Sequence, residues 1–161
     1  MNEFPGVRMA LGAPPAVEHR EQPVIIGTVR HAEGVNTMPA SLSPKQIAAA
    51  LTEHWSPRVI GEVDDAYIKV AKVHGTFGWH AHADEDELFF VLEGRLRIEI
   101  EAGEAVDLDA GEMFIVPKGV RHNPVAVEPC LVLLIERKST LHSGDTVNAY
   151  TRSLADQLRP T

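Results

Sequence analysis

Cysteine is nearly absent from this chain, which has Cys130 alone among its 161 residues. One thiol cannot form an intrachain disulfide, and a lack of disulfides fits a reducing compartment, so we expect a cytoplasmic protein. Cys130 precedes the apolar run LVLLI, which predicts a small buried side chain and not a nucleophile.

Long apolar runs and an excess of positive charge are also lacking. No stretch reaches the roughly 18 apolar residues of a membrane-spanning helix, and the N-terminus lacks the charged-then-apolar layout of a signal peptide. The 15 Lys and Arg residues are outnumbered by 23 Asp and Glu, which gives a net charge of −8. Because anionic surfaces repel such a chain, we expect neither nucleic acid nor a membrane as its partner.

What remains is the composition of a soluble globular protein with one domain. The hydrophobic share is 44% and the charged share 24%, and 161 residues suffice for a real core. Residues 1–40 are rich in proline and show little periodicity, so we expect an extended N-terminal arm in which residues 23–30 could form one strand. We assign residues 41–161 to the domain, with a core barrel at about 57–137.

One helix is predicted at residues 43–55, SPKQIAAALTEHW. Ser43 can cap it, and Pro44 suits the first helical position, where a missing N–H costs nothing. Apolar residues recur every four positions along it and form one stripe, and Ser56-Pro57 ends it. The stripe consists of Ile47, Leu51 and Trp55. The tail at 151–159 could form a second, short helix.

Short strands separated by turns are predicted from residue 59 to residue 137. The segments are VIGEV, AYIKVAKV, GWHAH, ELFFVLEG, RLRIEIE, AVDLDAG, EMFIVPKG and CLVLLIER. RLRIEI alternates cleanly between Leu96, Ile98 and Ile100 on one face and charged residues on the other. Many short strands with Gly and Pro between them predict an all-β sandwich or barrel.

Two features predict a covered outer sheet face and hence a homodimer. CLVLLIE is apolar on both of its faces, so it needs an outer cover, either the 43–55 helix or another subunit. Phe77 and Trp79 have the parity opposite to the neighbouring histidines and should face outward, between layers or at a subunit contact. The alternative is a monomer in which residues 1–40 fold back over these strands.

A candidate metal site lies in GWHAHADEDELFFVLEG, residues 78–94. His80 and His82 are two apart in an extended stretch, so both imidazoles point to one face. A polar turn follows, and Glu87 begins the returning strand, where its carboxylate can reach them. His122 begins another strand after a Pro-Lys-Gly turn. Three imidazoles and one carboxylate suit a divalent ion such as Zn, Fe, Mn, Ni or Cu.

These residues also match two spaced motifs in the right order. The first consists of His80, His82, Glu87 and Gly94, and the second of Gly111, Pro117, Gly119 and His122. In this the chain resembles the cupin superfamily, and specifically its small single-domain members. Two positions depart from the family pattern: His74 stands where a glycine is expected, with Gly75 beside it, and Ala126 stands where an asparagine is expected.

The resemblance implies a double-stranded β-helix, or jelly-roll barrel, with a metal held by His80, His82, Glu87 and His122. Cupins carry out isomerase, dioxygenase, lyase and decarboxylase chemistry, and a fold does not choose among them. We therefore expect a metal-dependent enzyme acting on a small organic molecule, with isomerase-like and dioxygenase-like reactions both open. The alternative is a non-catalytic module that binds or senses a small molecule.

The remaining side chains of interest are interpreted as structural or solvent-exposed, apart from possible substrate contacts in the barrel interior. Phe89 and Val91 should line the barrel interior, as core or as substrate contacts, and one of Lys69 and Lys72 should face inward. The arginines at 95, 97 and 121 should be solvated or point away from the site. The remaining histidines have no partnered spacing and are interpreted as surface or structural residues: His19, His31, His54, His74 and His142.

Overall fold

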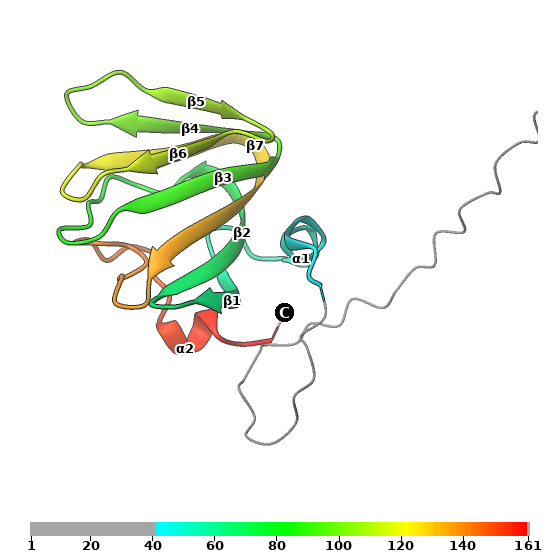
Figure 1. Cartoon of the computed structure of the whole chain (residues 1–161). Coiled ribbons are helices and arrows are strands. Elements are labelled where there is room, and N and C mark those ends of the chain that lie inside the picture. The colour runs from blue at the N-terminus through cyan, green and yellow to red at the C-terminus, as the bar shows by residue number, and fades with distance from the viewer. Residues whose placement is uncertain (1–40, 161) are drawn as a thin grey trace, which may run out of the picture.

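The computed structural model describes residues 41–160, in which the strands pair antiparallel around a central strand, β7 (Figure 1). The strands are β1 (Arg58–Val63), β2 (Ala66–Thr76), β3 (Glu87–Glu93), β4 (Arg95–Ile100), β5 (Val106–Asp109), β6 (Met113–Val116) and β7 (His122–Arg137). One edge of β7 pairs with β2, while the other pairs first with β4 and then with β3. This all-β jelly-roll architecture confirms the predicted fold class.

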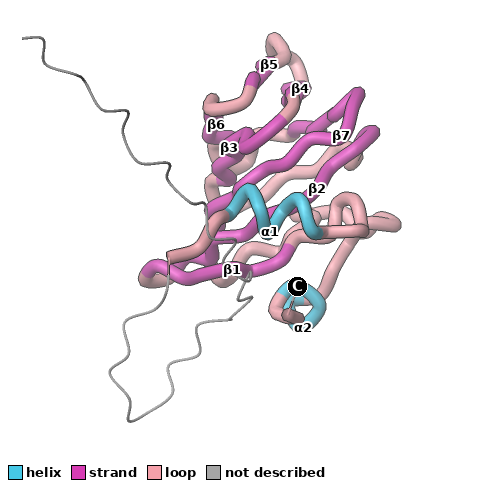
Figure 2. The backbone as a smooth tube through the Cα atoms, turned by 90° about the vertical axis from the view of Figure 1, so that its right-hand side faces the viewer, coloured by secondary structure: helices cyan, strands magenta, loops and turns pink. Residues whose placement is uncertain are grey.

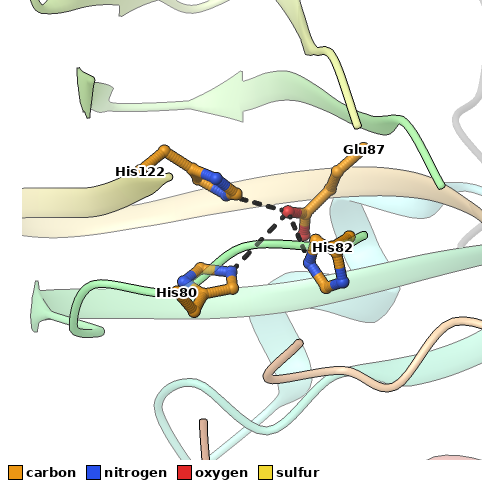
Figure 3. A group of neighbouring side chains, drawn as sticks. All are labelled: His80, His82, Glu87 and His122. Atoms are coloured by element: carbon orange, nitrogen blue, oxygen red, sulfur yellow. Dashed lines mark hydrogen bonds and ion pairs between the residues drawn. The ribbon is translucent and has the colours of Figure 1, made fainter. Parts of the chain in front are cut away.

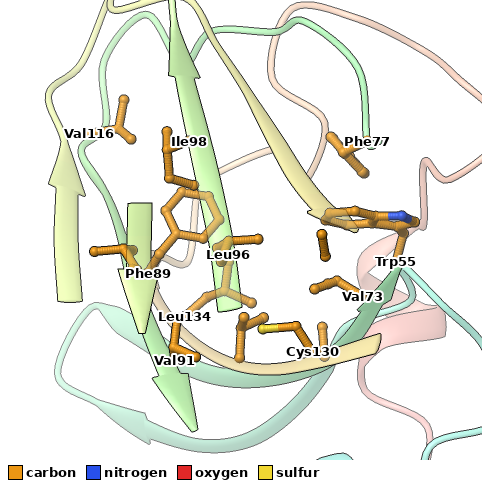
Figure 4. Close-up of a cluster of buried hydrophobic side chains, with 14 residues drawn as sticks. Trp55, Val73, Phe77, Phe89, Val91, Leu96, Ile98, Val116, Cys130 and Leu134 are labelled. Atoms are coloured by element: carbon orange, nitrogen blue, oxygen red, sulfur yellow. The ribbon is translucent and has the colours of Figure 1, made fainter. Parts of the chain in front are cut away.

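The barrel interior is filled by the inward-facing residues of β2, β3, β4 and β7 (Figure 4). Because strand side chains alternate, every second residue faces this core, as the buried Leu96 and Ile98 of β4 do. Phe89 and Val91 are buried here, as predicted. Cys130 is also buried in this cluster, and burial raises the pKa of its thiol to about 12. The thiol is therefore part of the packing, as the sequence indicated.

Helix α1 (Pro44–Ala50) covers part of the outer face of the sheet (Figure 2). Its first turn follows the prediction, since Ser43 accepts a hydrogen bond from the Gln46 amide and Pro44 follows the cap. Ile47 and Ala48 pack against β2 and β7, where they bury Leu131. The predicted helical cover for the doubly apolar strand therefore exists, but only at one end of it.

The helix is shorter than the predicted 43–55. It ends at Ala50 because Leu51 has extended backbone angles, φ −66° and ψ 134°. Lys72 donates from Nζ to the carbonyls of Ala49 and Leu51, which have no helical partner. Trp55 leaves the stripe, takes a φ of 55° and enters the barrel core, where its indole donates to the His74 carbonyl at 2.7 Å. Core packing thus overrides the helical periodicity.

Segment 77–82 is not a strand, although GWHAH was predicted to be one. Gly78 has a φ of +114°, which breaks the alternation of side chains. Past this residue the segment makes only an isolated bridge between His80 and His122. Consequently Phe77 is buried in the barrel core with the histidines and does not face outward, so this half of the outward-face prediction is wrong.

The C-terminal tail follows β7 and ends in α2 (Leu154–Gln157), which lies beside β1 (Figure 1). Ser153 and Asp156 form a capping box, which explains the short helix predicted at 151–159. The N-terminal arm and its candidate strand at 23–30 lie outside the described residues. In the described part of the chain, no helix combines the length and apolar character needed to cross a bilayer.

Candidate metal centre

Four side chains from three separate segments meet inside the barrel (Figure 3). His80 and His82 come from segment 77–82, Glu87 from the start of β3, and His122 from the start of β7. One nitrogen or oxygen atom of each lies within 4.8 Å of those of the others, and all four residues are buried. The structure therefore brings together the four residues that the sequence singled out.

Backbone hydrogen bonds hold these segments in register. His80 and His122 exchange two amide–carbonyl bonds of 3.0 and 2.9 Å, and the Gly119 amide donates to the His82 carbonyl at 2.7 Å. β3 pairs with β6 so that Glu87 lies opposite Val116. Each of the four side chains is thus placed by main-chain contacts that do not depend on the cluster itself.

The turn before His80 is held by Asn123. Its Oδ1 accepts from the Gly78 amide at 2.8 Å and from the Thr76 hydroxyl at 2.9 Å, and its Nδ2 donates to Glu99 at 2.8 Å. Asn123 directly follows His122, so one buried side chain ties the two histidine-bearing segments together. The sequence showed this asparagine beside His122 but assigned no role to it.

Glu87 lies at the centre of the cluster. Its Oε2 is 3.0 Å from Nε2 of His122, 3.1 Å from Nε2 of His82 and 3.8 Å from Nε2 of His80. Burial by itself would raise the pKa of this carboxyl, but the three imidazoles outweigh it and hold the pKa well below its usual range. Glu87 is therefore ionised. Burial opposes the charged form of His82, yet the contact with Glu87 prevails and raises the pKa of that imidazole.

The orientation of two imidazoles is fixed by backbone carbonyls. Nδ1 of His80 lies 3.0 Å from the Gly78 carbonyl, and Nδ1 of His122 lies 3.1 Å from the Val120 carbonyl. A carbonyl can only accept, so Nδ1 of each ring carries a proton, and Nε2 is the nitrogen turned toward the Glu87 carboxylate. Nε2 of each ring and the carboxylate oxygen are therefore the atoms that could ligate a cation bound at this point, and metal-bound histidines usually have such a second contact at Nδ1.

A small cavity adjoins the cluster. Its volume is about 30 Å³, and the residues that line it are His80, Glu87, His142, Trp55, Pro57, Ala71, Val73, Phe77, Pro124, Val132 and Leu134. Most of this wall is apolar, so a ligand that reaches the cluster meets little competing polarity. His142 was interpreted from sequence as surface or structural, and its place beside the cluster was missed. No local spacing could have shown it, because His142 lies beyond β7 and reaches the cavity only through the path of the loop.

Apart from Phe77 and His142, these candidates lie as the sequence predicted. Lys69 is the inward lysine and forms a buried ion pair with Glu136 at 2.7 Å, whereas Lys72 caps α1. Arg95 and Arg97 are exposed and pair with Asp109 and Asp107. Arg121 pairs with Asp145 and Glu101, away from the cluster. Among the remaining histidines, His54 and His74 are exposed, and those at 19 and 31 lie outside the described residues.

Known proteins with similar sequences and folds include cupins. A sequence model described as "Cupin domain" matches residues 67–136. An uncharacterized protein of Bacillus subtilis, YdbB, is 36% identical over 92 residues, which is 57% of this chain and 81% of that protein. The crystal structure of a cupin-2 domain containing protein from Shewanella frigidimarina has 44% sequence identity and a TM-score of 0.58, and the match covers 60% of this chain and 94% of that one.

One relative with a named activity is 3-hydroxyanthranilate 3,4-dioxygenase of Xanthomonas campestris pv. campestris. It is 37% identical over 73 residues, which is 43% of this chain. The match spans only 42% of the length of that enzyme. The likeness therefore leaves more than half of the relative unmatched.

Proposed function

The chain belongs to the cupin family, and from that premise we propose that it is a metal-dependent enzyme acting on a small organic molecule. His80, His82, Glu87 and His122 hold one divalent transition-metal ion, such as Zn, Fe, Mn or Ni, in this proposal. The observation that carries it is the convergence of three imidazoles and a carboxylate on one buried point, with Nε2 of His80 and His122 directed at Glu87.

Four protein ligands leave open positions around an ion that prefers six. Held by these four residues, such an ion would supply Lewis acidity at a substrate oxygen or, as iron, oxidative chemistry with dioxygen. The chain's own residues set the conditions for this chemistry. The apolar side chains around the cavity exclude water, and the carbonyls behind His80 and His122 keep both rings in the ligating tautomer.

Dioxygenase-like chemistry on a hydroxylated aromatic compound is the reaction class we favour. 3-Hydroxyanthranilate 3,4-dioxygenase of Xanthomonas campestris is 37% identical to this chain over 73 residues, which supports this choice. The wall of the cavity is mostly apolar, which suits such a substrate better than a phosphorylated sugar. Lys69, the inward cation that a sugar-phosphate isomerase would need, is already neutralised by Glu136.

The second candidate is a module that binds or senses a small molecule without turning it over. The observation in its favour is the small size of the cavity, about 30 Å³, with its mostly apolar wall. Against it stands the presence of polar groups on the same wall, since His142 lines the cavity together with His80 and Glu87. A group that can exchange hydrogen bonds beside a bound ligand favours an enzyme.

Oxygen uptake by the iron(II)-loaded protein tests this function. We expect substrate-dependent oxygen consumption with at least one member of a panel of 3-hydroxyanthranilate, catechol, gentisate and hydroquinone. His122→Ala should abolish it, because this change removes one imidazole from the cluster. Calorimetry with the same panel supplies the contrast. If members of the panel bind but none causes oxygen uptake with iron, manganese or nickel, the protein is a binding module and not an enzyme. If no member binds and none causes oxygen uptake, both candidate functions are rejected.

A further inference from the structure

His142 is a buried polar group for which the four-residue cluster gives no explanation. Its ring lines the cavity that also contacts His80 and Glu87. Its Nε2 is buried without a hydrogen-bond partner among residues 41–160. Buried polar atoms in proteins are nearly always paired, so an unpaired one on a cavity wall indicates a partner other than residues 41–160.

The loop that carries His142 is tied to the segment that carries the histidines of the cluster. Asp145 accepts from the Ala81 amide through Oδ1 at 3.0 Å, and its own amide donates to the Ala81 carbonyl at 3.0 Å. Gly144 makes this approach possible. It has a φ of +55°, and a Cβ there would lie 2.2 Å from the Ala81 carbonyl oxygen. The position of His142 relative to His80 and His82 is therefore fixed by main-chain contacts.

Aromatic packing fixes the ring as well as the loop. Phe77 makes an edge-to-face contact with His142 at 5.2 Å between ring centroids and another with His80 at 4.9 Å. Tyr150 stacks on Phe77 at 6.0 Å between ring centroids. Phe77 thus contacts the imidazoles of both His142 and His80, and both imidazoles line the same cavity.

The imidazole of His142 is neutral near pH 7. Burial, together with the positive charge of Lys69, lowers its pKa to about 4, with only partial opposition from Glu87. A neutral ring can donate from one nitrogen and accept at the other, and it brings no net charge into the apolar cavity. Such a group is suited to a hydroxyl, which both donates and accepts, and poorly suited to a phosphate.

We propose that His142 is a substrate-binding residue whose Nε2 hydrogen-bonds a hydroxyl group of the organic ligand beside the metal centre. This inference rests on the proposed function and narrows its substrate class to small hydroxylated compounds with an otherwise apolar frame. This role would also explain why the 140–150 loop places the imidazole of His142 on the cavity wall.

Matched ligand pairs test this role on the cobalt(II)-loaded protein. The pairs are glycolate with acetate and 3-hydroxybenzoate with benzoate, each differing by one hydroxyl, and affinities come from the visible cobalt spectrum. We expect the wild-type protein to prefer the hydroxylated member of at least one pair by about tenfold, the effect of one buried hydrogen bond. His142→Phe should erase that preference. His142→Gln, which retains a hydrogen-bonding group, should recover part of it.

His74→Phe is the matched control, because His74 is exposed and outside the cavity. It should leave the preference unchanged. His142→Phe should still fold, since the new ring replaces one that already packs on Phe77, and far-UV circular dichroism checks this. Equal preferences in wild type and His142→Phe, or no preference in either pair, would overturn the role of His142. Failure of the wild-type protein to bind cobalt would instead overturn the proposed metal centre, and this role with it.

Discussion

Lys69 and Glu136 form an ion pair inside the barrel, one of the few places where charge is fully buried in the described chain. Nζ of Lys69 donates to Oε2 of Glu136 at 2.7 Å, and Oε1 of Glu136 has no partner among residues 41–160. Removing one member of such a pair leaves an uncompensated buried charge, whereas replacing both by apolar side chains of similar volume can be nearly neutral.

We therefore predict that Lys69→Met lowers the free energy of unfolding by about 3–5 kcal/mol. The double variant Lys69→Met, Glu136→Leu should lie much closer to the wild-type protein. Urea unfolding measures both. A single variant as stable as the wild type would show that water or another group solvates Glu136, and that the pair is not isolated in the core.

At the level of residues, local spacing predicted which side chains lie together in the cluster. His80, His82, Glu87 and His122 are identified by the intervals between them, and the structure places them together. His142 could not be found in this way. Its proximity to the cluster depends on Gly144 and Asp145 docking a distant loop against Ala81. No spacing between residues in the sequence predicts that loop contact.

At the scale of elements, alternation and capping signals predicted most of the fold. The β4 segment RLRIEI alternates as expected, and α1 begins at its predicted capping residue, Ser43. The errors arose where one residue left a regular conformation. Gly78 interrupts the expected GWHAH strand and turns Phe77 inward, and Trp55 leaves the helical stripe for the barrel core. Periodicity assumes that the backbone stays regular, and these positive φ values break that assumption.

The same error changes the expected subunit contact. Phe77 is buried within its own barrel, so its side chain cannot contact a second subunit. The outer faces of β6 and β7 do present apolar side chains that α1 leaves uncovered: Met113 is 56% exposed, Ile115 45% and Ile135 38%. Leu88 of β3 pairs with both Ile115 and Ile135, so these side chains form one continuous surface.

At the scale of the whole molecule, we propose that two copies of the chain associate through this surface, defined by Met113, Ile115, Leu88 and Ile135. Extended apolar patches are rare on monomers, and a two-fold contact presents the same patch from both copies. Light scattering should give about twice the 17.6 kDa chain mass. Ile115→Glu should return the protein to the monomer mass, because it places a charge in the middle of the contact.

Trp79→Glu serves as the comparison, since Trp79 is 39% exposed but belongs to segment 77–82. We expect it to leave the dimer intact. Dissociation by Trp79→Glu and not by Ile115→Glu would move the interface to the histidine-bearing segment. A wild-type mass near 17.6 kDa would reject the dimer altogether.

The most direct measurement is the metal content of the purified chain after reconstitution with cobalt(II) and exhaustive dialysis. The wild-type protein should retain one ion per chain. His82→Ala should bind it about 100-fold or more weakly, because it removes one of four ligands, while far-UV circular dichroism stays native since the barrel has its own apolar core. His74→Ala, an exposed histidine outside the cluster, should bind like the wild type. Full occupancy in His82→Ala, or no retained metal in the wild-type protein, would contradict a centre built from His80, His82, Glu87 and His122.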